Sequence, residues 1–225
     1  MAAPLVEARD RKGQSPEGWV TYALRGTDGP VAEIRPSTHR RPGLVDLRYG
    51  RRPGELIVSA HGHSSQLPLR TNGVAAVAAT MCMPSIPVLD DLFAELRRVL
   101  RPAGTLAALV PSRSIRSLTE LRIWRPIRRT LAGHPGFRNE SACDLLHWLL
   151  VAADFAVMVD QRRTFWLPVP DGESAVHVID GLVESGIWPP DVEPERLGQA
   201  RQALARFAAP GRALPIPLRL LVARR

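Results

Sequence analysis

Histidines that follow an apolar run are the residues of this sequence best suited to chemistry. His61 and His63 lie two positions apart after the apolar run 56–60, and His39 precedes them. Residues two apart share one face if the strand continues. A neutral imidazole can ligate a metal ion or act as a general base near pH 7. No acid or cysteine completes a ligand set with recognisable spacing, so we expect no metal site.

A second candidate for chemistry is the arginine-rich segment 113–138. Its arginines are Arg113, Arg116, Arg122, Arg125, Arg128, Arg129 and Arg138. They could form a lid or docking face for an anionic substrate or an acidic partner. An apolar stripe at helical spacing favours the simpler interpretation of a solvated amphipathic helix. The stripe consists of Leu118, Leu121, Trp124, Ile127 and Leu131.

Apolar runs alternate with helical patterns along the chain. Strands are predicted at 30–34, 44–47, 56–60 and 74–81, and the last is apolar on both faces, as a central parallel strand is. Apolar residues recur every three or four positions over 89–100, which predicts a helix that ends before Pro102 and Gly104. Strands at 105–110, 155–167 and 218–223 and helices at 173–185 and 195–208 complete the pattern. This alternation predicts an α/β protein with a mainly parallel sheet and helices on both faces.

Composition and missing motifs narrow the function classes. The chain has 225 residues, 45% of them hydrophobic, which is enough for one core, and no apolar run is long enough to span a membrane. Two cysteines without a CxxC partner favour a reducing cytoplasm. The net charge of +8 is almost all arginine, but no nucleic-acid-binding motif accompanies it, so we do not expect nucleic acid as a partner. No GxSxG elbow or P-loop occurs, which argues against common hydrolases and nucleotide triphosphatases.

Residues 66–111 carry the most specific pattern of the chain, QLPLRTNGVAAVAATMCMPSIPVLDDLFAELRRVLRPAGTLAALVP. The pattern resembles the middle of class I S-adenosylmethionine-dependent methyltransferases of the type 11-like group, where "LPF…DGSFDAV" is followed by "E…RVLRPGG" and a buried strand. Ala153-Asp154-Phe155 stands where that family has "aGF". The resemblance implies a Rossmann-like, doubly wound, mostly parallel sheet with an antiparallel terminal strand pair and helical insertions. We expect a loose N-terminal arm within 1–27 and a methyltransferase-like domain over 28–225, with insertions at about 113–138 and 172–210.

The resemblance also assigns cofactor-binding positions. Glu33 matches the family's first-strand acid, Asp46 its ribose-binding acid, and Gly62-His63 stands in place of its "GD". The family's aspartate in "FDAV" falls on Ala75, and no glycine occurs between residue 34 and Gly43, where the family has its glycine-rich loop. A proline and arginines there replace residues that need a free φ and no side chain. The resemblance therefore implies S-adenosylmethionine as the cofactor, bound in a weakened or lost standard site.

Two functions follow from these positions. The first is a divergent methyltransferase that transfers a methyl group from S-adenosylmethionine to a small molecule. The second is a non-catalytic or repurposed protein of the same fold that binds a protein partner or a ligand without methyl transfer. The sequence identifies no catalytic residue and leaves the choice of homo- or hetero-oligomer open.

Overall fold

A computed structural model describes residues 6–36, 46–49, 55–60, 66–113 and 117–225. Its described strands form one seven-stranded sheet in the order β2-β3-β1-β4-β5-β7-β6. The strands are β1 (Val31–Pro36), β2 (Asp46–Tyr49), β3 (Glu55–Ala60), β4 (Val74–Thr80), β5 (Leu100–Pro111), β6 (Ala156–Pro168) and β7 (Ala213–Arg224). β3, β1, β4 and β5 run parallel, and β7 lies antiparallel between β5 and β6. The predicted mostly parallel sheet with an antiparallel terminal pair is confirmed.

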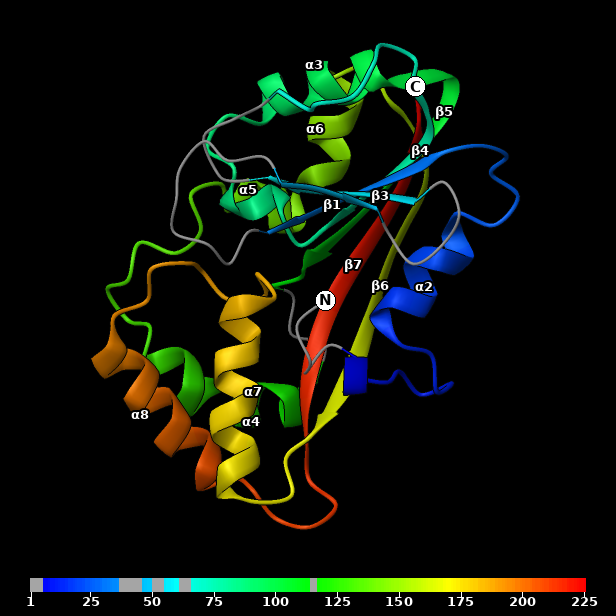
Figure 1. Cartoon of the computed structure of the whole chain (residues 1–225). Coiled ribbons are helices and arrows are strands. Elements are labelled where there is room, and N and C mark those ends of the chain that lie inside the picture. The colour runs from blue at the N-terminus through cyan, green and yellow to red at the C-terminus, as the bar shows by residue number, and fades with distance from the viewer. Residues whose placement is uncertain (1–5, 37–45, 50–54, 61–65, 114–116) are drawn as a thin grey trace.

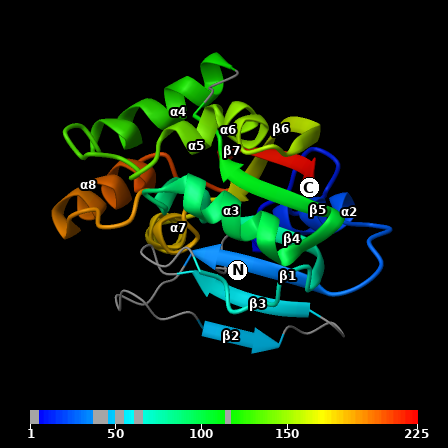
Figure 2. The same cartoon turned by 90° about the horizontal axis from the view of Figure 1, so that it is seen from above.

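The strand predicted at 44–47 corresponds to β2, but β2 is an antiparallel edge strand and not a parallel strand beside β1. β2 begins at Asp46 and runs antiparallel to β3 at the edge of the sheet, as Figure 2 shows. β3 takes the parallel position next to β1. A parallel crossover needs a dozen or more residues, and the segment 37–45 between β1 and β2 is too short for one. The chain instead reaches β2 first and turns back into β3.

Helices cover both faces of the sheet (Figure 1), as the alternation predicts. One face carries α3 (Leu89–Val99), α5 (Ser141–Asp144) and α6 (Leu146–Ala152). The other carries α2 (Pro16–Ala23), α4 (Leu118–Arg129), α7 (Gly172–Glu184) and α8 (Pro194–Ala205). All seven residues of β4 are buried, since they alternate between the two cores. Among the described helices, none combines the length and apolarity needed to cross a bilayer.

The N-terminal segment packs onto the sheet from residue 6 onward, where the sequence predicts a loose arm. Ala8 is fully buried, and Arg9 forms a two-residue antiparallel bridge with Trp166 of β6. Trp19 of α2 is 2% exposed and lies 5.7 Å from the Phe165 ring, measured between ring centroids. Burying one large aromatic side chain stabilises a fold by several kcal/mol, about 3 or more. The segment is therefore part of the core that lies between the sheet and the helices α4, α7 and α8.

The arginine-rich segment forms an amphipathic helix, α4, with a rotated buried face. Trp124 and Ile127 are buried as predicted, but Leu118 and Leu121 are exposed. Glu120 is buried in their place, and its carboxylate accepts a hydrogen bond from Thr164 of β6 at 3.1 Å. A polar contact to the sheet therefore fixes the rotation of the helix, which apolar spacing alone does not reveal.

Candidate functional site

The parallel strands bring a small group of residues to one edge of the sheet. β1, β3, β4 and β5 all end there, and their order places a topological switch point between β1 and β4. Ligands of doubly wound sheets bind outside the carboxyl ends of the strands at such a point. The described residues beside it are Glu33 and Arg35 of β1 and Met81 and Cys82, which follow β4. We call these four residues the switch-point site.

Glu33 and Arg35 form a bidentate ion pair at the end of β1. Arg35 Nε lies 2.6 Å from Glu33 Oε1, and Nη2 lies 2.7 Å from Oε2. The two residues share one face because side chains alternate along a strand, and Ala32 and Ile34 are buried on the other face. The side chains of Glu33 and Arg35 are 13% and 25% exposed. Both oxygens of the first-strand acid are therefore held by a neighbouring guanidinium.

The chain turns sharply where it leaves β4. Met81 is fully buried and has φ 56°, in the left-handed region. That conformation costs a residue with a side chain roughly 1–2 kcal/mol. A hydrogen bond of 2.7 Å from Met81 N to the Leu109 carbonyl holds the turn.

Cys82 is not a nucleophile near neutral pH. Burial raises the pKa of its thiol to about 12, and the charge of Glu33 adds to the increase. A thiol needs a depressed pKa and access to solvent to react. Cys82 therefore contributes packing to the switch-point site, and its coupling to Glu33 shows that the ends of β1 and β4 lie close together.

The structure places the other predicted cofactor residues only in part. The backbone of Asp46 is opposite Ser59, near the end of β3, so the antiparallel strand brings it to the same edge. Asp46 is the first residue of β2, whereas the sequence predicts a strand that begins at residue 44. Gly62 and His63 lie outside the described residues, as do His39 and His61. In the described part of the chain, no group of three or more His, Cys, Asp or Glu side chains could hold a metal ion.

Ala75 lies at the opposite edge of the sheet. It is the second residue of β4, and its backbone N–H donates to the carbonyl of Pro30, just before β1, at 2.8 Å. From Ala75 to the end of β4 at Thr80 the strand rises about 16 Å. The expectation that Ala75 belongs to the altered cofactor site is wrong, because the amino end of a strand cannot reach a ligand at its carboxyl end.

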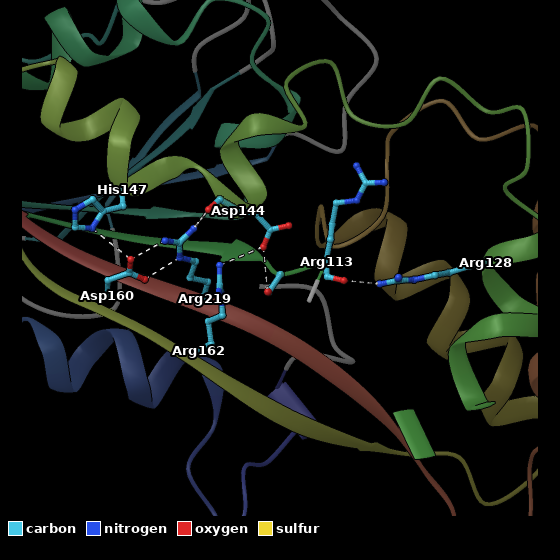
Figure 3. Close-up of polar contacts among 8 residues, drawn as sticks. Arg113, Arg128, Asp144, His147, Asp160, Arg162 and Arg219 are labelled. Carbon is cyan, nitrogen blue, oxygen red and sulfur yellow. Dashed lines mark hydrogen bonds and ion pairs between the residues drawn. The ribbon is translucent and has the colours of Figure 1, made fainter. Parts of the chain in front are cut away.

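A polar cluster lies near the end of β5, and Figure 3 shows its members pointing toward one another. Arg219 of β7 is 5% exposed and donates two hydrogen bonds to Asp160 of β6, at 2.8 and 2.6 Å. It also donates to the carbonyl of Asp144 in α5. His147 Nδ1 lies 3.3 Å from Asp160 Oδ2. The Arg219 guanidinium holds the pKa of the Asp160 carboxyl below its ordinary value.

The carboxylate of Asp144 joins the same cluster to the end of β5. Its Oδ1 lies 3.4 Å from Ser112 Oγ and 3.5 Å from Arg162 Nη2. Arg113 follows Ser112 in the chain, and its side chain pairs with Glu140. The backbone carbonyl of Arg113 accepts a hydrogen bond from Arg128 of α4 at 3.4 Å. Four separate elements therefore meet through charged groups, an arrangement that fixes α5 and α6 against β6 and β7.

Sequence reasoning missed Arg35 and Arg219 as partners of Glu33 and Asp160. The spacing of Glu33 and Arg35, two residues apart on a strand, is a signal for a same-face pair. Arg219 stands alone in the apolar run 213–223, and a charge within such a run predicts a buried ion pair. No comparable signal marks Asp144 or Asp160.

Comparison with known proteins supports the fold. No protein-family model matches the chain, and no curated protein matches it in sequence. Among solved structures, a protein from Anaeromyxobacter dehalogenans described as a type II methyltransferase aligns over 96% of each chain, with a TM-score of 0.50 and 16% identity. The chain has the class I S-adenosylmethionine-dependent methyltransferase fold.

Other methyltransferase structures align over similar lengths. A protein from Bacillus halodurans described as a methyltransferase aligns over 91% of this chain and 97% of its own, with a TM-score of 0.49 and 14% identity. A geranyl diphosphate methyltransferase in complex with S-adenosylmethionine aligns over 92% of this chain and 84% of its own, with a TM-score of 0.44 and 11% identity. At such identities the likeness concerns the methyltransferase fold, and the residues of the site must be judged on their own contacts.

Proposed function

We propose that this methyltransferase-fold protein acts on a small molecule at the carboxyl edge of its sheet and holds S-adenosylmethionine only weakly. The observation that carries the proposal is the Glu33–Arg35 ion pair. A sulfonium nucleotide carries a positive charge and ribose hydroxyls, so its site needs free carboxylate oxygens and close backbone approach. At the end of β1, the acid is occupied by a guanidinium and the strand leaves through Pro36.

The described glycines add support to this proposal. Added Cβ atoms at Gly29, Gly73 and Gly104 would lie within 3.1 Å of neighbouring atoms, so these positions need glycine. Gly29 and Gly73 precede strands, and Gly104 lies in the first half of β5, all at the amino edge. These three glycines therefore serve strand packing, whereas none of the four residues of the switch-point site is a glycine. The residues of the switch-point site therefore fit the standard binding mode of S-adenosylmethionine poorly.

A second candidate function follows from the same pair. If Arg35 keeps Glu33 occupied when a ligand is present, the protein binds a ligand or partner at this edge without methyl transfer. The fold alone does not distinguish the two functions, since one scaffold supports many sites.

Calorimetric titration with S-adenosylmethionine and S-adenosylhomocysteine tests the proposal. At 1 mM ligand, a dissociation constant of about 1 mM stabilises the native state by about 0.4 kcal/mol, against about 4 kcal/mol for 1 µM. We expect the weaker result. We also expect tighter binding by Arg35→Ala, which frees the Glu33 carboxylate, and no gain in the matched variant Arg35→Ala/Glu33→Gln.

Two outcomes would overturn the weak-cofactor proposal. One is a micromolar dissociation constant for the unaltered protein that Asp46→Ala abolishes. The other is an Arg35→Ala variant that binds no tighter than the parent while Glu33→Gln also leaves affinity unchanged. Mass spectrometry of copurifying small molecules after incubation with S-adenosylmethionine then distinguishes the two functions. A methylated product indicates an enzyme, and its absence indicates a protein that binds without methyl transfer.

A further inference from the structure

A hollow lies at the amino edge of the sheet, at the opposite ends of the strands from the switch-point site. It encloses about 310 Å³ beside the loop that follows α2, the starts of β4 and β5, and the end of β7. Its polar lining consists of Arg25, Thr27, Arg101, Thr105 and Arg224. We call this hollow the amino-edge pocket. Its volume is at the lower end of the range for small-molecule sites, about 300–1,000 Å³.

Three arginines from distant parts of the sequence line the amino-edge pocket. Arg25 lies over the Tyr22 ring, with its Cζ 4.7 Å from the ring centroid. Arg101 Nη1 would lie 3.4 Å from a Cβ atom built on Gly29, so the guanidinium packs against the bare backbone of that glycine. Arg224 pairs in register with Thr105, which places both at the wall of the pocket.

These three arginines lack the acidic partners that other arginines of the protein have. Arg98, Arg163 and Arg219 each pair with a carboxylate within 3.1 Å. The side chains of Arg25, Arg101 and Arg224 make no hydrogen bond or ion pair with any residue in the described ranges, and none of the residues lining the pocket is acidic. Three like charges around one hollow repel one another unless an anion enters.

The donor set identifies the chemistry of that anion. The three guanidinium groups donate without accepting, and the hydroxyls of Thr27 and Thr105 can donate as well. Guanidinium forks match the spacing of phosphate oxygens and bind them bidentately. We propose that the amino-edge pocket binds a small phosphate-bearing molecule through Arg25, Arg101 and Arg224. This site lies across the sheet from the switch-point site, so the proposal does not depend on S-adenosylmethionine binding.

Titration with pyrophosphate at low ionic strength tests the proposal. We expect saturable binding that raises the melting temperature, and at least a tenfold loss of affinity in Arg101→Ala/Arg224→Ala. The matched control is Arg122→Ala/Arg125→Ala, which removes the same charge from the exposed face of α4 and should leave affinity unchanged within about twofold. Without ligand, the pocket variant should melt like the parent, because the side chains of these two arginines make no hydrogen bonds in the described structure. Arg101→Gln/Arg224→Gln repeats the test if the alanine variant fails to fold.

A thiol reporter places the ligand in the pocket. Met158 lines the pocket and is 62% exposed, whereas both native cysteines are buried. Met158→Cys should therefore give one reactive thiol, and pyrophosphate should slow its alkylation. No stabilisation at about 5 mM pyrophosphate, equal losses in the pocket and control variants, or unprotected labelling would each overturn the proposal. Citrate should bind at least tenfold more weakly; equal affinity would overturn the assignment to phosphate.

Discussion

Replacing Arg219 by methionine removes the guanidinium that joins β7 to Asp160 while keeping much of its apolar stem. The Arg219 side chain is 6% exposed and that of Asp160 is 28% exposed. Breaking a buried pair by removing one partner costs roughly 3–5 kcal/mol, because the other charge stays desolvated. Water reaches Asp160 in part, so we expect a loss of about 2–4 kcal/mol in the free energy of unfolding at pH 7.

The loss should appear as a large thermal shift. For a chain of this size, each kcal/mol lowers the melting temperature by about 2–4 °C, so Arg219→Met should melt roughly 5–15 °C below the parent. Urea unfolding gives the free energy directly. Arg122→Met is the matched control, since Arg122 lies on the exposed face of α4 and its side chain makes no hydrogen bond or ion pair within the described ranges, and it should change stability by less than about 0.5 kcal/mol.

The pH dependence gives the sharper test. Arg219 lowers the folded-state pKa of Asp160 below its unfolded value. The stabilisation by this pair is therefore present above the unfolded pKa and is lost as the pH falls through the folded pKa. The difference in the free energy of unfolding between the parent and Arg219→Met should therefore become smaller below about pH 4.

A double-mutant cycle with Asp160→Asn isolates the pair. We expect a coupling energy of about 1.5–3 kcal/mol at pH 7, as for hydrogen bonds to charged groups. A loss below about 1 kcal/mol for Arg219→Met at pH 7 would refute the reasoning. A coupling energy that stays constant as the pH falls would refute the assignment of the effect to the Asp160 carboxylate.

Two further predictions concern the two cores. Trp19→Ala should destabilise the protein by about 3–5 kcal/mol in urea unfolding, because a 2%-exposed ring between Phe165 and Arg163 leaves a cavity; a loss under about 1 kcal/mol would mean that α2 is not part of the core. Cys82 and Cys143 should resist alkylation at pH 8 until the protein unfolds, since burial raises the pKa of each thiol to about 12; fast labelling of either thiol in the native protein would contradict their buried placement.

Local patterns were sufficient to predict the central part of the fold. The spacing over 89–100 gave α3, and all five apolar positions predicted for its buried face from Leu89 to Val99 are buried. The apolar run at 74–81 gave β4. Such predictions succeed because burial on a regular element imposes a period of 3.6 or 2 on neighbouring residues. The same local view failed for β2, since strand direction depends on the partner strand and on the length of the connection.

The sequence by itself therefore determined the layers of this protein: an apolar sheet, an amphipathic cover and a methyltransferase-like order of elements. Only the tertiary structure decided which charges meet. Strand register brings Arg219 to Asp160 across a strand pair, and the packing of a turn and two strands brings Arg25, Arg101 and Arg224 to one pocket from three parts of the chain. The physical reason is the sequence separation of the contacts. Apolar burial produces a periodic pattern among neighbouring residues, which can be read from a short segment. A polar contact between distant residues depends on strand register and side-chain direction, which a short segment does not determine.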